Sequence, residues 1–304
     1  MKKKNFLTLL NLLFLSVAMF SCSENNGFDD DDDNNNSSNS DNKLKEGQIE
    51  LRGFSDSNAH GTLSFYAATD KITIDWGDGS KINEITPNGV EQRFYHEYAN
   101  QNFQTALINT KKLTLLGLSD RSSEGYWKEV RIGSCLDLQK IGIGSNHKIT
   151  VLNIKNAPSL TWLSCGGNRL TSLDISGCKA LTELSCGGNQ LTSLDVSGCK
   201  ALTELSCSNN QLTSLDLSGC EALTTVDCSG NQLTSLDVSG CKALTTLNCN
   251  NHYYYPNKNQ LTASALNALF QSLPTVESGT IFCYDNPGYG TCDKSIATKK
   301  GWKV

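Results

Sequence analysis

Apolar residues recur with a period of 21 through the second half of the chain. The units read L-T-x-L/V-x-C-x-x-N-x-L-T-S-L-D-φ-S-G-C-K/E-A, where φ is Ile, Val or Leu, and they begin at Leu160, Leu181, Leu202, Leu223 and Leu244. A unit this short cannot bury its own apolar side chains and must stack on its neighbours. The period therefore predicts a solenoid over residues 121–261, with regular units from residue 160.

The first half of each unit carries the pattern of one short strand. In the first regular unit, Leu160, Leu163 and Cys165 stand at positions 1, 4 and 6, and Asn168 and Leu170 follow at positions 9 and 11. The Leu and Cys side chains are expected to point inward. The Asn should turn inward where the chain bends, because buried backbone groups need hydrogen-bond partners. The second half alternates again, which predicts a second extended segment on the opposite side of a flat coil.

Both ends of the repeat region depart from the regular unit. A degenerate coil with one inserted residue precedes it, at Leu138, Ile141, Ile143, Asn146, Ile149, Leu152 and Ile154. Residues 252–258 interrupt the last unit, and residues 262–273 then have helical periodicity that Pro274 stops. Residues 262–304 are expected to form a small helical C-terminal cap, with one more strand near Ile281, over the open end of the solenoid.

Residues 47–120 alternate apolar and polar positions in short runs. These runs predict strands at residues 49–51, 63–66, 72–76 and 106–108, with a tight glycine turn at residues 77–80. Several short strands at this spacing are typical of a β-sandwich. The expected fold class is therefore mostly β: an N-terminal β-sandwich, then a solenoid with a small helical C-terminal cap.

Trp76-Gly77-Asp78-Gly79, followed by His96-Glu97-Tyr98, resembles the polycystic-kidney-disease (PKD) type of immunoglobulin-like domain. The match departs from that family's fuller motif, which has an extra residue and a Phe between the Trp and the Gly. The resemblance implies a spacer or a protein-binding module. Asp75 and Asp78 suit a cation, but turn aspartates more often accept neighbouring backbone N–H groups. We expect that structural role for both, and a framework hydrogen bond for His96.

The order Leu160, Leu163, Cys165, Asn168 and Leu170 is the L-x-x-L-x-L-x-x-N-x-L of a leucine-rich repeat with Cys at the third Leu. Over residues 138–261, this 21-residue unit resembles the cysteine-ladder internalins, bacterial surface proteins used in attachment. The resemblance implies that a ligand binds at the cell surface, without indicating which ligand.

The first 21 residues, with three lysines and then an apolar stretch that ends at Ser21, resemble the signal peptide of a bacterial lipoprotein. Met19 and Phe20 depart from the commonest form of the lipobox. We expect Cys22 to carry the lipid, and ordinary cleavage with secretion is the alternative. The protein would then be exported and anchored by its lipid in the outer membrane.

Residues 22–46 form an acidic stretch rich in Asn and Ser, too polar to bury a core, which predicts a disordered tether. An acidic stretch behind a lipidated Cys also resembles the surface-export signal of some Gram-negative lipoproteins, so exposure at the cell surface is expected. The net charge is −5 and the chain contains no basic cluster beyond its first residues. Nucleic acid is therefore not an expected partner, and the membrane is expected to be contacted only through the lipid.

The chain contains thirteen cysteines, most of them in two columns at alternating spacings of 13 and 8 residues, which suits stacked coils better than a zinc site. Column neighbours have parallel Cβ vectors that aim the sulfurs poorly for a disulfide, so buried free thiols are expected. Cys283 and Cys292 either pair across the turn at residues 286–288 or stay free.

No catalytic residue, cofactor or metal is expected. The four histidines lie in different segments, and none shares a recognisable motif with a Cys, Ser or acid. Stacked aspartates could attract Ca²⁺, but we expect each to be exposed and balanced by the lysine that follows in most units. These aspartates are Asp174, Asp195, Asp216 and Asp237.

The outward positions of the first strand are mostly small and polar, with Trp162 at one end and the Tyr253–Tyr255 insert at the other. We expect a monomer that binds a protein or a glycan here, because aromatic residues anchor interfaces. The candidate residues are Trp162, Glu183, Glu204, Thr225, Asp227, Thr246, Asn248, Tyr253, Tyr254 and Tyr255. Two alternatives stay open: the aromatics only cover the edges of the solenoid, and the protein is a structural or accessory module without a soluble ligand.

Overall fold

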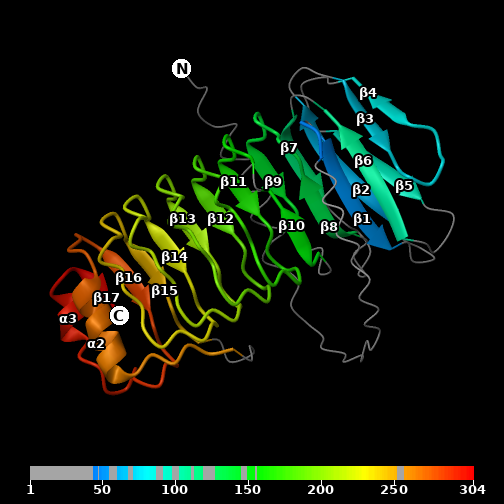
Figure 1. The fold of residues 1–304 in the computed structure, drawn as a ribbon. Helices are drawn as coiled ribbons and strands as arrows, with labels where there is room; N and C mark the ends of the chain where they lie inside the picture. Colours follow the sequence, from blue (N-terminus) through cyan, green and yellow to red (C-terminus); the bar gives the residue numbers. More distant parts are fainter. Residues whose placement is uncertain are drawn as a thin grey trace, which may run out of the picture. The chain divides into compact units, whose positions relative to one another are not determined.

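A computed structural model describes residues 44–46, 48–54, 60–67, 71–86, 92–97, 103–110, 113–118, 127–144, 149–154, 156–251 and 257–304. They belong to one compact unit, Leu44–Val304. This unit is mostly β with few helices, as the sequence predicts (Figure 1). Among the described residues, no helix has the length and apolar character that a membrane span requires.

The repeat region forms a β-solenoid with one three-residue strand per regular coil. Neighbouring strands pair in parallel and in register, so equivalent residues of successive units lie side by side (Figure 1). The strands are β9 (Lys140–Gly142), β11 (Trp162–Ser164), β12 (Glu183–Ser185), β13 (Glu204–Ser206), β14 (Thr225–Asp227) and β15 (Thr246–Asn248). β16 (Gly279–Phe282) extends the series after the interruption and pairs with β15, as predicted for Ile281.

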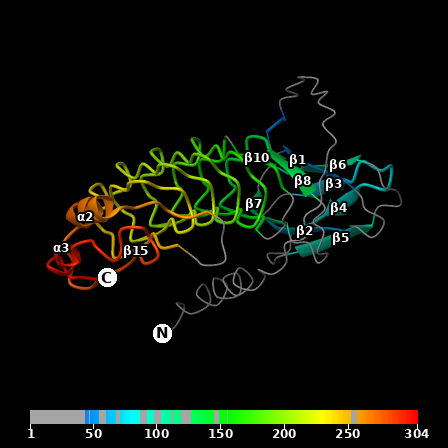
Figure 2. The same ribbon diagram turned by 90° about the horizontal axis from the view of Figure 1, so that it is seen from below.

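The core of the solenoid follows the 21-residue pattern. Leu160, Leu163, Cys165 and Leu170 are fully buried, and so are their counterparts in the following units. Stacking therefore buries the apolar residues that a single unit would leave exposed. The loops of successive coils lie side by side in the second view as well (Figure 2).

The second half of the coil is not the extended strand that its alternation predicts. Leu173, Ile175 and Cys178 are buried, but the backbone there forms turns. Among the described residues, the one isolated β-bridge joins Asn153 and Asp174. The alternation correctly identifies which residues face the core, but it does not imply strand pairing.

A column of asparagines closes each coil, as predicted. In the first regular coil, Asn168 donates through Nδ2 to the carbonyls of Ile143 at 2.9 Å and Cys165 at 3.1 Å, and its Oδ1 accepts the Ile149 N–H at 3.3 Å. The amide therefore joins its own coil to the preceding one. The other members of the column are Asn189, Asn210, Asn231, Asn259 and Asn286.

The N-terminal strands lie in two sheets. One sheet has the order β10-β8-β1-β6-β3-β4, and the other runs β17-β16-β15-β14-β13-β12-β11-β9-β7-β2-β5. The four strands predicted from the sequence are present as β1 (Gln48–Phe54), β2 (His60–Ala67), β3 (Ile72–Asp75) and β6 (Phe103–Asn109). The remaining ones are β4 (Asn83–Ile85), β5 (Gln92–Glu97), β7 (Leu113–Leu118), β8 (Trp127–Ile132) and β10 (Val151–Asn153).

Both sheets continue from these strands into the coils. β7 pairs in parallel with β9, and β8 pairs in parallel with β10. The first coil thus adds to strands that themselves belong to antiparallel pairs. The predicted boundary at residue 120 lies outside the described residues.

The C-terminal cap contains the predicted helix. α2 (Ala263–Ser272) begins at Thr262, whose side chain accepts the Ala265 N–H at 3.3 Å, and it buries Leu266, Leu269 and Phe270. Lys300 donates to the carbonyls of Gln271 and, at 2.7 Å, Leu273, and so satisfies the end of the helix. α3 (Ser295–Thr298) and β17 (Trp302–Lys303) complete the cap over β16.

The turn after β3 uses its aspartates structurally. Asp75 accepts the Gly77 N–H at 2.9 Å, and Asp78 accepts the Ser80 N–H at 3.0 Å. His96 lies 2.7 Å from Asp78 through Nε2 and stacks on Trp76, with the rings 5° from parallel. The expected framework roles of these residues are confirmed.

The Asp78 carboxylate in this turn should make the free energy of unfolding depend on pH. Burial raises the pKa of Asp78, but hydrogen bonds from Ser80 and His96 outweigh it and lower the pKa from 3.8 to about 2. A depressed folded-state pKa stabilises the protein above about pH 4, and this contribution is lost as the pH falls towards 2. The free energy of unfolding, measured with urea between pH 6 and pH 2, should fall as the pH is lowered. Asp78→Asn should make this fall smaller, and an unchanged pH profile in that variant would contradict the role of Asp78.

Candidate ligand-binding face

The outward residues of β11 to β16 form one face, called here the strand face. The first column holds Trp162, Glu183, Glu204, Thr225, Thr246 and Thr280 in register. The second column holds Ser164, Ser185, Ser206, Asp227, Asn248 and Phe282. The structure thus brings the candidate residues from Trp162 to Asn248 together on one surface.

Trp162 lies at the N-terminal end of the strand face. A Cβ added at Gly142 of the adjacent strand would lie 3.3 Å from Cζ3 of the Trp162 ring. The indole therefore extends across the neighbouring strand, in a space that only a small residue leaves open. Lys140 stands beside Trp162 in the same column, and Glu183 stands on its other side.

Two carboxylates stand next to each other in the middle of the strand face. Glu183 and Glu204 are in register on adjacent parallel strands, whose backbones are about 4.8 Å apart. Burial raises the pKa of Glu183, the charge of Glu204 raises it further, and Lys140 opposes both. No ion pair of either glutamate occurs among the described residues.

Past the glutamates, the second column changes from serine to Asp227 and Asn248. Asp227 accepts the N–H and the hydroxyl of Ser229 through Oδ1, at 3.0 and 2.6 Å. Asn248 accepts the Asn250 N–H through Oδ1 at 3.3 Å. Each side chain is thereby held in one orientation on a half-buried position.

The C-terminal end of the strand face holds two aromatic residues that the sequence analysis missed. Phe282 and Tyr284 are 41% and 44% exposed, and Cys283 between them points into the core. The register at Cys283 already predicts an outward position on either side of it. Reading the outward columns only through the regular units leaves both residues out.

The remaining predicted site residues are either outside the described residues or not paired as one alternative had it. The first group contains Cys22, the signal, the tether up to residue 43 and Tyr253–Tyr255. Cys283 and Cys292 are both free thiols, so a disulfide between them is not formed. The Sγ of Cys292 instead lies 3.4 Å from the Tyr289 carbonyl, while Cys283 continues the inward column.

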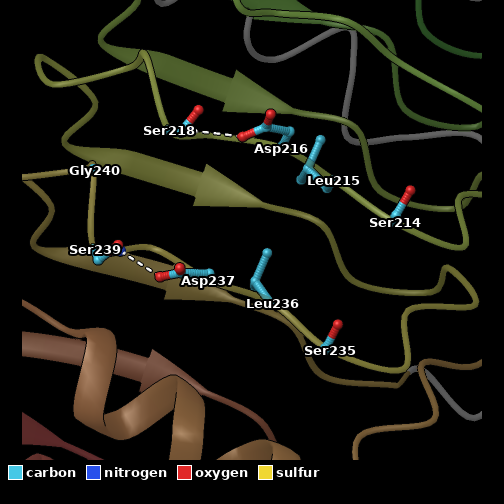
Figure 3. A pocket seen from close by; sticks show the side chains of 9 residues that line it. All are labelled: Ser214, Leu215, Asp216, Ser218, Ser235, Leu236, Asp237, Ser239 and Gly240. Atoms are coloured by element: carbon cyan, nitrogen blue, oxygen red, sulfur yellow. Dashed lines mark hydrogen bonds between the residues drawn. The ribbon is translucent and has the colours of Figure 1, made fainter.

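The aspartate column lies in the second half of the coils, where two neighbouring coils enclose a groove of about 260 Å³ (Figure 3). Asp216 and Asp237 accept the N–H groups of Ser218 and Ser239 at 2.9 and 2.8 Å. The aspartates are exposed, as expected. Backbone N–H groups are their partners, while Lys242 pairs with Glu221 at 3.1 Å, so the expected balance by lysine is wrong for Asp237.

No group of three or more His, Cys, Asp or Glu side chains suited to a metal occurs in the part of the chain that the structure describes. The buried cysteines form columns, but burial raises the pKa of their thiols, which disfavours the thiolate that a metal requires. The strand face itself presents hydroxyl, carboxylate, amide and aromatic groups.

Comparisons with known proteins identify the repeats. The sequence model described as "Leucine Rich repeats (2 copies)" matches residues 158–198, 179–219 and 200–240. The chain thus carries leucine-rich repeats, as its spacing predicts. No curated protein matches the sequence.

Three solved structures are similar to parts of the chain. The functional domain of InlJ from Listeria monocytogenes, which includes a cysteine ladder, is 32% identical over 57% of this chain and 35% of its own, with a TM-score of 0.46. Internalin InlF from Listeria monocytogenes is 19% identical, over 44% and 46%, with a TM-score of 0.30. The leucine-rich repeat domain of APL1B is 22% identical, over 50% and 56%, with a TM-score of 0.34. The chain spans less than two thirds of each.

Proposed function

We propose that this protein binds a protein or glycan ligand at the bacterial cell surface through the strand face. The observation that carries the proposal is the register of β11 to β16, which aligns mostly polar, solvent-accessible side chains in two columns across six strands. Leucine-rich repeats commonly mediate protein interaction, and the described residues supply no metal cluster.

The proposal includes the attachment of the protein to the cell. Cys22 would carry the lipid, residues 23–43 would form the tether, and the strands that precede the coils would act as a PKD-like sandwich. Labelling with a radioactive fatty acid should mark the protein and be lost in Cys22→Ala. Protease added to whole cells should remove it, if it is exposed at the outer membrane.

Substitution of the strand face should abolish ligand capture without unfolding the protein. Trp162→Ala removes the largest side chain of the first column, and Glu204→Lys reverses a charge beside Glu183. Such anchors typically contribute about 2 kcal/mol or more to an interface, which is about 30-fold in affinity. Capture from extracts of host or cell envelope, followed by a binding titration, measures the effect. A combined Tyr253–Tyr255→Ala variant tests the remaining predicted residues.

Ser214→Ala, on the opposite half of the coil, is the matched control and should bind as the wild type does. Equal melting temperatures would show that the variants are folded. Unchanged capture by every strand-face variant would contradict the site. Failure of the wild type to capture any ligand would favour the alternative, a structural or accessory module of a surface complex.

A further inference from the structure

The last coil of the solenoid replaces two small residues by exposed aromatics. The two positions flanking the inward Cys hold Ser and Gly in the first two regular coils, and Asn248 and Asn250 in the coil before the interruption. Around Cys283 they hold Phe282, the last residue of β16, and Tyr284, which follows the strand; their ring centroids are 6.5 Å apart at 87°. Two large apolar side chains that remain more than 40% exposed contribute little to the core, so a role in recognition accounts for them better.

The neighbours of these aromatics are polar groups in fixed positions. Phe282 is in register with Asn248, and Asn248 is in register with Asp227. The contacts with Asn250 and Ser229 occupy Oδ1 of each side chain. The Nδ2 group of Asn248 therefore remains to donate, and Oδ2 of Asp227 remains to accept. A carboxylate, an amide and an aromatic ring thus follow one another at about 4.8 Å intervals, over about 10 Å.

This combination matches the chemistry of a sugar ring. A pyranose has an apolar C–H face that packs on the negative face of an aromatic ring, and hydroxyl groups on its rim that both donate and accept hydrogen bonds. Asp227 would repel an anionic sugar, which leaves neutral ones. The length of the row corresponds to one or two sugar rings.

A protein partner fits this end of the face less well. A stable protein interface needs about 800 Å² per partner around a cluster of buried anchors. Beyond Phe282 and Tyr284, the nearest outward positions are Thr280, Thr246 and Thr225, which are too small to act as anchors. The cluster has the size of a small-ligand site.

We infer that Phe282, Tyr284, Asn248 and Asp227 form a binding site for a neutral saccharide. The inference rests on the proposed binding function and specifies the ligand class and the end of the strand face. Phe282 and Tyr284 provide the stacking surface, the Asn248 amide donates to a sugar oxygen, and the Asp227 carboxylate accepts from a hydroxyl.

Binding of the purified protein to immobilised oligosaccharides tests the inference. The probes are neutral di- to hexasaccharides of glucose, galactose, mannose and N-acetylglucosamine, with sialylated galactosides as the anionic comparison. At least one neutral probe should bind, and calorimetry should confirm it. Phe282→Ala and Tyr284→Ala should each weaken binding at least about tenfold, and Tyr284→Phe should weaken it less. Asn248→Ala and Asp227→Asn should also weaken it.

Ser214→Ala, on the opposite half of the coil, is the control and should leave saccharide binding unchanged. Capture by the Trp162 and Glu204 variants tests the proposed function, whereas the saccharide titrations test only the Phe282 end, so the two proposals can fail separately. Melting temperatures of the Phe282 and Tyr284 variants should match the wild type, since both side chains are exposed.

Three results would overturn the inference. The first is no binding of any neutral probe by the wild type at millimolar concentration. The second is saccharide binding that survives both aromatic substitutions. The third is loss of a captured protein in Phe282→Ala and Tyr284→Ala without saccharide binding by the wild type, which would assign this end to a protein interface.

Discussion

Asn231→Ala is expected to destabilise the solenoid by about 3–5 kcal/mol. Asn231 is fully buried and donates to the carbonyls of Cys207 and Cys228 at 3.1 Å each, while its Oδ1 accepts the Leu212 N–H at 3.1 Å. Alanine leaves the Leu212 N–H buried without this partner, which costs about 1–3 kcal/mol. It also removes one of the two amide donors of each carbonyl, at about 1 kcal/mol apiece, since Cys207 keeps Asn210 and Cys228 keeps Asn259. The loss would be a large share of the 5–15 kcal/mol that typically stabilises a domain.

Urea unfolding followed by circular dichroism measures this loss. Asn231→Asp should be at least as destabilising at neutral pH, because it places a second oxygen against the two carbonyls. Ser235→Ala, an exposed position of the same coil, is the control and should stay within about 0.5 kcal/mol of the wild type. A loss below about 1 kcal/mol in Asn231→Ala would mean that water or a relaxed backbone replaces the amide.

The ladder thiols are expected to react at least about a thousandfold more slowly in the folded protein than in the unfolded one. Burial raises the pKa of Cys165, Cys178 and Cys241 to about 12, and that of Cys207 well above its usual value. The thiolate is the reactive form, so at pH 8 only about one buried thiol in 10,000 is ionised. The ladder cysteines are also inaccessible until a coil opens.

A thiol reagent added at pH 8, with and without denaturant, tests this expectation. Cys292 is partly exposed and should react first in the folded protein, and Cys292→Ser should remove this fast phase. In denaturant, all twelve cysteines of the described residues should react. A count below about six would show bridged ladders, and fast reaction of several ladder thiols without denaturant would show that the coils open readily.

The sequence predicts the solenoid well because one pattern is repeated in register. Each copy independently assigns the Leu and Cys positions to the core and the Asn to the bend, and the buried positions agree. The α2 helix is predicted equally well, from its periodicity and from Pro274 after its end. These signals arise from residues that are close together in the chain, so they can be recognised in a single sequence.

Features that depend on distant segments were not predictable in this way. The pairing of β7 with β9 joins strands about 25 residues apart, and no local pattern encodes their register. The Lys300 side chain donates to the Leu273 carbonyl at the end of α2, although the two residues are 27 positions apart in the chain. The turn-like second half was misread because alternation reports burial, and two extended segments pair only if their backbones also align.

The site was partly predictable for the same reason. Columns from Trp162 to Asn248 follow from the period, so the sequence places them on one face. Phe282 and Tyr284 come after the interruption at residues 252–258, where the count of 21 no longer applies. Only the parallel pairing of β15 with β16 extends the columns to them.

The in-register pairing also determines how the solenoid would respond to a mechanical load. A protein held at its N-terminus and pulled through a ligand at β16 would be stretched across its strands, along the hydrogen bonds between coils. Such bonds are loaded one coil at a time, so the coils would peel away in sequence. Each 21-residue coil spans about 70 Å when extended but occupies about 4.8 Å in the stack. Every released coil would therefore lengthen the protein by about 65 Å, and the solenoid would act as a stepwise extensible link that limits the force on the bound ligand.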